Sequence, residues 1–280
     1  MSAVARPPVN EVALAISFQP QSVLEGPRLM VGLGSILAEF PDVTEVPPYE
    51  MSVEQPFEEQ LLRPSAPSIK FMGAQSLPRR YWFTTPGSSP LLLQVQENYF
   101  ALNWRRQDDE PYPGFDRLVE EFESYLSKFQ DAIIAQGGAE LQITQLELTY
   151  INILKPDGIW GSTADLGKVV ALQAAGLEKC EQLNFTYSRS LNDTNSGEFY
   201  GRLHAAVATG YTPKIEPTDL LPLRAPDVIP VINVSLTGRS GEIDERVAGL
   251  ARRFEPAHDA VTEAFKGLTT DAARRSWGLL

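Results

Sequence analysis

The 280-residue chain has one cysteine, Cys180, and two histidines, His204 and His258. A single thiol cannot form an intramolecular disulfide, which favours a reducing compartment. One cysteine and two histidines are also too few for the usual ligand sets of structural zinc. We therefore expect no metal centre.

Basic residues are scarce as well, because 24 Lys and Arg stand against 36 Asp and Glu, a net charge of -12. Such a charge repels nucleic-acid phosphates and anionic lipid. Folding could still gather the four Arg-Arg pairs into one basic patch, although paired surface arginines are usually solvated or bound to acids. These pairs are Arg79-Arg80, Arg105-Arg106, Arg252-Arg253 and Arg274-Arg275. Nucleic acid is not expected as a partner.

Long apolar runs are absent too. None approaches the roughly 18 residues that span a bilayer, and the first 18 residues lack the basic start and apolar block of a signal peptide. The sequence predicts a cytoplasmic protein with no membrane partner.

Motifs that carry chemistry are also missing. There is no G-x-S-x-G, and Gly32-Leu33-Gly34 lies in a helical pattern without the Lys-Ser/Thr of a phosphate loop. The acidic run 108–110 is consecutive, so its carboxylates point in different directions. We expect no cofactor, and the balance leans away from an enzyme.

Periodicity predicts the elements of the first half. Alternating apolar residues indicate a strand over 11–18, helical spacing indicates a helix over 24–40, and prolines leave 41–80 as short edge strands or loop. Strand character returns at 81–83 and 91–105, where Glu97-Asn98 predicts a hairpin turn. An apolar stripe over 115–136 predicts a long helix.

The second half repeats this order. We expect a strand over 141–154, a helix from Ser162 to Cys180, and a final long helix over 242–268 that bends at Pro256. Further strands are predicted over 183–191, 199–211 and 228–237, and a short helix over 271–277.

The shared order predicts an α+β fold of two similar halves, 1–138 and 139–280, related by an internal duplication. Each half would run strand, helix, antiparallel strands, helix, with long helices packed on one face of one or two mainly antiparallel sheets. Coincidence remains the alternative explanation of the repeat.

Candidate site residues come from polar positions within predicted strands. His204, Arg202 and Tyr200 share one strand face and are candidates for catalysis, against the alternative of a solvent-facing structural histidine. The candidates for ligand binding are Asn103, Asn152 and Asn233, which could line a groove or simply form the wet face of a sheet.

Several segments together resemble a family of uncharacterised bacterial proteins of about this length with a sporadic distribution. They are P-P-V-N-E-V-A-L-A-I-S-F, Y-F-A-L-N-W-R-R, Y-P-G-F-D-R-L, L-E-L-T-Y-I-N-I and H-D-A-V-T-E-A-F-K-G-L-T-T with a later W. The likeness extends over nearly the whole chain. It implies a cytoplasmic prokaryotic protein of an accessory or defence-associated system and carries no catalytic residues with it.

Two functions of different classes follow. The preferred one is a non-enzymatic binding protein, in which a sheet face or the segment 41–80 engages a protein partner or a second copy of the chain. The alternative is a small-ligand-binding or catalytic α+β domain with a pocket near His204.

Overall fold

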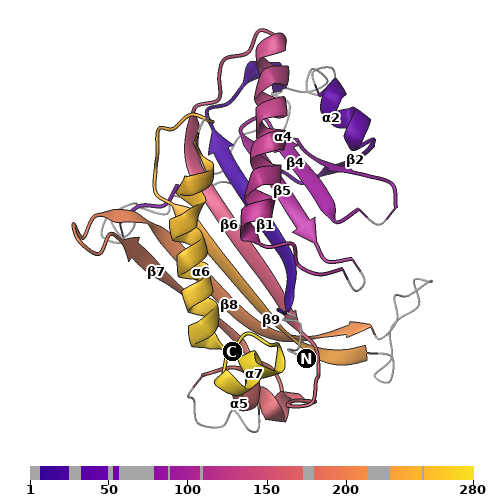
Figure 1. Ribbon diagram of the computed structural model, residues 1–280, viewed down its shortest axis with the longest axis vertical. Coiled ribbons are helices and arrows are strands. Elements are labelled where there is room, and N and C mark those ends of the chain that lie inside the picture. Colours follow the sequence, from indigo (N-terminus) through magenta and orange to yellow (C-terminus); the bar gives the residue numbers. More distant parts are fainter. Residues whose placement is uncertain are drawn as a thin grey trace, which may run out of the picture.

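The computed structural model describes residues 7–24, 33–49, 53–56, 79–87, 89–107, 110–172, 180–213, 228–247 and 249–280. Within these residues one continuous antiparallel sheet of nine strands runs in the order β2-β3-β4-β5-β1-β6-β9-β8-β7 (Figure 1). The strands are β1 (Val9–Phe18), β2 (Asp42–Val46), β3 (Arg80–Thr84), β4 (Leu91–Gln96), β5 (Tyr99–Arg105), β6 (Ile143–Leu154), β7 (Asn184–Asn192), β8 (Phe199–Pro213) and β9 (Val228–Ser240).

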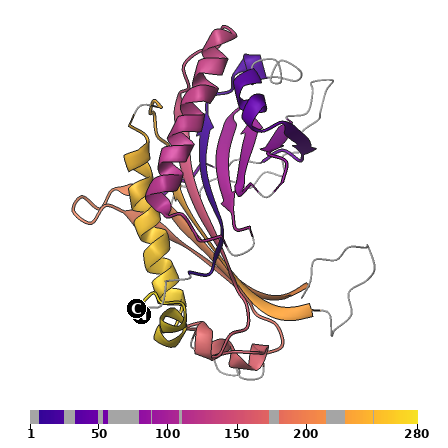
Figure 2. The ribbon, with the colours of Figure 1, turned by 45° about the vertical axis from the view of Figure 1, so that its right-hand side comes forward.

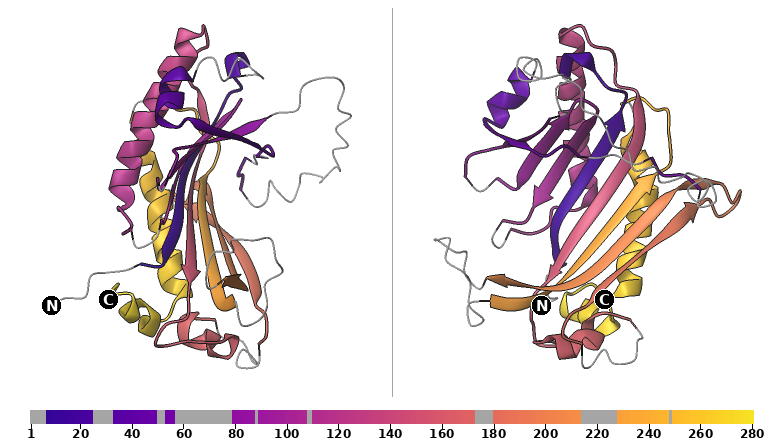
Figure 3. Two further views of the ribbon diagram at one scale, coloured as in Figure 1. Left: turned by 90° about the vertical axis from the view of Figure 1, so that its right-hand side faces the viewer. Right: turned by 180° about the vertical axis from the view of Figure 1, so that it is seen from behind.

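Helices cover one face of this sheet. The helices of the described residues are α2 (Gly34–Glu39), α4 (Phe115–Ala135), α5 (Leu166–Val169), α6 (Glu255–Leu268) and α7 (Asp271–Ser276), and α4 and α6 are the two that lie along the sheet. The ribbon turned about its vertical axis shows α4 beside the first strands and α6 beside the later ones, both on the same side (Figure 2). We call this side the helix face. The opposite side, which the left view of Figure 3 shows in profile, is the open face.

Alternation along the strands sends apolar side chains to the helix face. In β1, Val12, Leu14 and Ile16 are buried among the core residues, while the small side chains between them point to the open face. Aromatic rings then join sheet to helix: Phe100 of β5 stacks on Phe129 of α4 with ring centroids 4.8 Å apart. Burying each such side chain contributes about 1.5–3 kcal/mol, so this layer holds α4 in place.

The α+β class holds, but the finer fold prediction is wrong. The sequence predicts two similar halves with long helices on antiparallel sheets, whereas one nine-stranded antiparallel sheet dominates and the helices on it are short. Among the described residues only α4, with 21 residues, exceeds 14. The strands β1 and β6 pair at the centre of the sheet and join the two predicted halves. The division into 1–138 and 139–280 stays a prediction.

The continuous helices predicted over 24–40 and 162–180 are wrong. The helical spacing of apolar residues there reflects which residues are buried, and it does not give the length of a helix. In the stretch 24–40, Leu33, Ile36 and Phe40 are all buried, yet α2 has only six residues, and 25–32 lie outside the described residues. In the stretch 162–180, a 3-10 turn and the four-residue α5 are described, and 173–179 are not.

The final helix begins later than predicted. Residues 241–247 cross the end of the sheet through isolated bridges, and α6 starts at Glu255. Pro256 therefore stands in the first turn of α6, where its missing N–H leaves no hydrogen bond unmade, instead of bending a longer helix. The predicted hairpin at Glu97-Asn98 and the helix over 115–136 are confirmed by β4, β5 and α4.

The contact between α6 and β9 depends on a glycine. A Cβ added to Gly238 would lie 2.9 Å from the Cβ of Ala257 and 3.1 Å from its Cα, so the helix would have to move. We expect Gly238→Ala to lower the free energy of unfolding by about 1–3 kcal/mol, as overpacked cores do. Gly267→Ala on α6 is the matched control, since nothing lies within 4 Å of its added Cβ. Urea unfolding measures both, and equal stability of the two variants would contradict the close packing.

Candidate functional site

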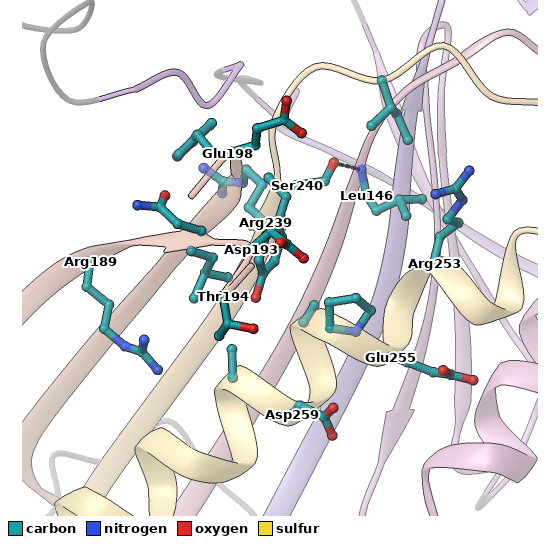
Figure 4. Close-up of a pocket in the computed structure, with 18 of the residues that line it drawn as sticks. Leu146, Arg189, Asp193, Thr194, Glu198, Arg239, Ser240, Arg253, Glu255 and Asp259 are labelled. Carbon is teal, nitrogen blue, oxygen red and sulfur yellow. Dashed lines mark hydrogen bonds between the residues drawn. The ribbon is translucent and has the colours of Figure 1, made fainter. Parts of the chain in front are cut away.

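A groove of about 1070 Å³ opens on the helix face, between α6 and the end of the β7–β8 hairpin (Figure 4). Among the strands, α6 packs chiefly against β9, so β7 at the edge of the sheet extends beyond the helix. Apolar side chains contribute to the lining of the groove, among them Leu191, Ile243 and Ala260.

Six acidic and three basic residues line the groove, and one of the three, Arg239, directs its guanidinium to carboxylates on the open face. Each guanidinium already binds carboxylate. The pairs are Arg189 with Glu263 at 2.9 Å, Arg253 with Glu245 at 2.5 Å, and Arg239 with Glu54 at 2.9 Å and Glu147 at 2.5 Å. The positive charges of the lining are therefore neutralised within the protein.

Three carboxylates of the groove have no ion pair within the described part of the chain: Glu198, Glu255 and Asp259. A fourth, Asp193, accepts hydrogen bonds from the backbone N–H groups of Asn195 and Ser196, which hold the pKa of its carboxyl below the usual range. Negative charge thus remains for a ligand.

A bulge brings Tyr200 to the groove. The β7–β8 ladder pairs Leu191 with Gly201 but Asn192 with Phe199, so Tyr200 is an extra residue on β8. Bulges of this kind redirect a side chain. Tyr200 consequently lines the groove, whereas the sequence predicts that it shares a face with Arg202 and His204.

The open face carries a cluster of charged residues around Glu54, whose side chain is 4% exposed. Its carboxylate lies 3.0 Å from Nε of Arg202, 2.8 Å from Nε2 of His204 and 2.9 Å from Nη1 of Arg239. Glu54 also forms a parallel bridge with Gly241 at the end of β9. One carboxylate therefore fastens residues 53–56 to two strands.

Electrostatics keep Glu54 ionised. Burial acts to raise its pKa, but the hydrogen bond and charge of His204 and those of Arg239 outweigh it, and the pKa falls to about 2 from an ordinary 4.5. Arg239 likewise stays protonated. Burial acts to lower the pKa of its guanidinium, but Glu147, Tyr49 and Glu54 outweigh burial and raise it.

A second carboxylate, Glu147 of β6, continues the cluster. Arg239 donates to it from Nε at 2.7 Å, and the Tyr49 hydroxyl donates to it at 2.9 Å. Burial first and the charge of Glu147 second raise the pKa of Tyr49 to about 12, so the phenol stays protonated and acts as a donor. We name Tyr49, Glu54, Glu147, Arg202, His204 and Arg239 the Glu54 cluster.

His204 has a second contact across the sheet edge. Its Nδ1 lies 2.8 Å from Oγ of Ser188, the residue directly opposite on β7. The His204 side chain is 35% exposed and Ser188 is exposed, so this end of the Glu54 cluster meets solvent.

The three candidate asparagines do not come together. Asn103 is buried between Gln94, which donates to it at 2.7 Å, and Glu11, to which it donates. Asn152 is buried and donates to the carbonyl of Val234. Asn233 is exposed on the neighbouring strand. The first two hold their surroundings together, and a binding role for the set stays a prediction.

Sequence reasoning missed Glu54, Arg239 and Ser188. Alternation places Ser188 and Ser190 on one face of their strand, but the register that sets Ser188 opposite His204 comes from the structure. Nothing local marks Glu54, which meets Arg202 across 148 residues of sequence. The other histidine, His258, is half-buried, stacking on Phe115 and contacting the Tyr150 hydroxyl at 3.1 Å. Burial lowers its pKa.

The arginine pairs are mostly occupied by partners. Arg79 binds Glu45, Arg105 binds Glu11, and Arg106 donates to the carbonyls of Pro7 and Val9. Arg274 binds Asp271. These side chains contact their own surroundings on separate strands and helices.

Within the described ranges, no three His, Cys, Asp or Glu side chains are grouped so as to hold a metal ion. No helix among the same residues is both long and apolar enough to cross a membrane. No protein-family model and no curated protein sequence matches the chain. The resemblance to the sporadic bacterial family therefore stays a prediction.

Removing the charge of Glu54 leaves Arg202, which is 6% exposed, without its carboxylate. Breaking a buried pair by losing one partner costs about 3–5 kcal/mol. We expect Glu54→Gln to lower the free energy of unfolding by that amount in a denaturant titration. Glu242→Gln, at an exposed position near the end of β9, should change it little. A loss below about 1 kcal/mol for Glu54→Gln would show that the pair is not fully desolvated.

Low pH should remove the contribution of the ionised Glu54 to the free energy of unfolding. Because the pKa of Glu54 is about 2 in the fold and 4.5 ordinarily, its stabilising effect is complete above pH 4.5 and is lost as pH falls toward 2. The stability difference between the wild type and Glu54→Gln should therefore narrow over this range. Denaturant titrations at successive pH values measure it, and a constant difference would contradict the ionised state of Glu54.

Proposed function

We propose that the chain is a binding protein whose groove beside α6 holds a cationic segment of a partner protein. The single observation that carries this proposal is the groove itself, about 1070 Å³ in volume, with an acidic lining and apolar side chains within it. Such a combination suits a segment that alternates basic and apolar residues.

Charge selects the sign of the occupant. The groove's guanidiniums already bind carboxylates, and Glu198, Glu255 and Asp259 remain for the ligand. A lysine or arginine placed between them gains attraction to several carboxylates at once, while a phosphate or carboxylate ligand would be repelled. The proposal therefore disfavours nucleic acid at this site.

Charge also argues against a second copy of the chain as the occupant. With 36 acidic and 24 basic residues, two copies repel each other. A partner with a basic segment is attracted instead, and steering by opposite charge raises the association rate.

The binding surface differs from the two that the sequence favours. The groove lies on the helix face, whereas the Glu54 cluster and residues 53–56 occupy the open face. Of the stretch 41–80, residues 50–52 and 57–78 lie outside the described residues. A role in a bacterial accessory or defence-associated system forms part of the proposal, supported by the resemblance to the sporadic family.

An oligoarginine peptide labelled with fluorescein tests the groove by fluorescence anisotropy. We expect saturable binding at low salt that weakens as salt screens the charges. Asp259→Lys should raise the dissociation constant about tenfold, which corresponds to about 1.4 kcal/mol of lost attraction.

Asp131→Lys is the matched control, because it makes the same charge change at an exposed position of α4, outside the groove. It should leave binding close to that of the wild type. Equal weakening by both variants would mean that the peptide senses only the net charge, and the groove proposal would fail.

A further inference from the structure

Ser188, His204 and Glu54 form a continuous hydrogen-bonded chain on the open face. Ser188 and His204 stand directly opposite each other on β7 and β8, with Oγ and Nδ1 2.8 Å apart. On the other side of the ring, Nε2 of His204 lies 2.8 Å from Oε1 of Glu54. A serine, an imidazole and a carboxylate in this order are the parts of an activated nucleophile.

The proton positions in this chain follow from Glu54. Its carboxylate is ionised and only accepts hydrogen bonds, so Nε2 of His204 carries a hydrogen toward it. In the neutral form of the imidazole, which is the form that acts as a base, Nδ1 then bears the lone pair and can accept from the Ser188 hydroxyl. The ring is turned relative to serine proteases, where the carboxylate meets Nδ1, but the roles are set by geometry and not by atom label.

The strand ladder directs the backbone N–H of Ser188 away from β8. The N–H of Thr209 donates to the carbonyl of Leu183, which makes that opposed pair a hydrogen-bonded one. Such pairs alternate with non-hydrogen-bonded pairs along antiparallel strands, and Ser188 with His204 lies five positions further on. The N–H and C=O groups of Ser188 therefore point away from β8, and β7 is the last strand of the sheet in the described part of the chain. Those of His204 point toward β9 instead.

We propose that Ser188 is the nucleophile of an acyl-transfer site that accepts carboxylic esters. His204 is its general base, Glu54 is a positioning residue that fixes the ring, and the outward N–H of Ser188 donates to the oxyanion. This activity goes beyond the proposed binding function and does not depend on it, because the groove lies on the other face of the sheet.

The reaction is balanced without a further reagent. Oγ of Ser188 bonds to the ester carbonyl carbon while its proton moves to Nδ1 of His204, and the carbonyl oxygen becomes the oxyanion. Collapse of this intermediate breaks the ester C–O bond, and the leaving alcohol takes the proton from Nδ1. Water then attacks the acyl-serine by the same route, giving a carboxylic acid and free Ser188.

The arginines of the Glu54 cluster do not replace His204 in this role. Arg202 and Arg239 are permanently protonated and cannot accept a proton from a hydroxyl. They bind the carboxylate of Glu54 and so hold it against His204. His204 is the member of the Glu54 cluster that faces Ser188, with Nδ1 2.8 Å from its Oγ.

A fluorophosphonate probe on the full chain tests the proposal. It should form one covalent adduct at Ser188, seen by intact mass and peptide mapping, in which a P–O bond replaces the P–F bond. Ser188→Ala should abolish the adduct, and His204→Gln should lower the labelling rate constant about a hundredfold, as loss of a general base does. Glu54→Gln should lower the same rate constant while leaving the probe's dissociation constant unchanged. If the role of Glu54 were purely structural, both quantities would change together.

Ser190→Ala is the matched control, since Ser190 lies on the same face of β7 but opposite Arg202. It should be labelled like the wild type. Absence of an adduct at Ser188, or labelling of His204→Gln at the wild-type rate, would overturn the proposal. If His204→Gln does not fold, hydrolysis of p-nitrophenyl acetate by the wild type against Ser188→Ala, whose side chain is exposed, decides the matter alone. Ser188→Ala should still bind oligoarginine. The experiments therefore distinguish a failure of the acyl-transfer proposal from a failure of the groove-binding proposal.

Discussion

The ion pairs of the Glu54 carboxylate are the interaction on which the arrangement of the open face depends. Burying one charge is costly, and it is sustained here because two guanidiniums and an imidazole converge on its two oxygens. The same contact joins residues 53–56 to β8 and β9 and leaves Arg239 shared with Glu147 on β6. Position and charge are therefore coupled: the ionised Glu54 fastens the segment to the sheet, and the contacts made on the sheet lower the pKa of Glu54 from 4.5 to about 2.

A single bulge separates the two candidate sites. Along β8, Arg202 and His204 point to the open face by simple alternation, while the extra residue Tyr200 turns to the groove beside α6. Residues close together on β8 therefore contribute side chains to opposite faces of the sheet. The groove can accept a partner without contact with Ser188, and a substrate at Ser188 does not meet the acidic lining of the groove.

The parts of the fold that the sequence predicts are those set by local contacts. The hairpin at Glu97-Asn98 and helix α4 depend on turn chemistry and on a 21-residue amphipathic stripe. The continuous helices predicted over 24–40 and 162–180 are wrong, because buried residues such as Leu33 and Ile36 keep helical spacing although α2 has only six residues. The contacts of Glu54 join residues 148 to 185 positions apart, and no spacing rule reaches that far. His204 and Arg202 could be placed on one face, but their common partner could not.

The charge balance within the Glu54 cluster favours a role for His204 in addition to holding residues 53–56 on the sheet. Arg202 and Arg239 supply two positive charges against the two carboxylates of Glu54 and Glu147, so the buried ion pairs are neutral without the histidine. The two guanidiniums and two carboxylates would therefore balance in charge in a cluster that only anchored residues 53–56. His204 instead stands at the solvent edge, 35% exposed, with one nitrogen on Glu54 and the other on an exposed serine. A neutral imidazole can donate a hydrogen bond from one ring nitrogen and accept one at the other, and the position of His204 between Glu54 and Ser188 uses both.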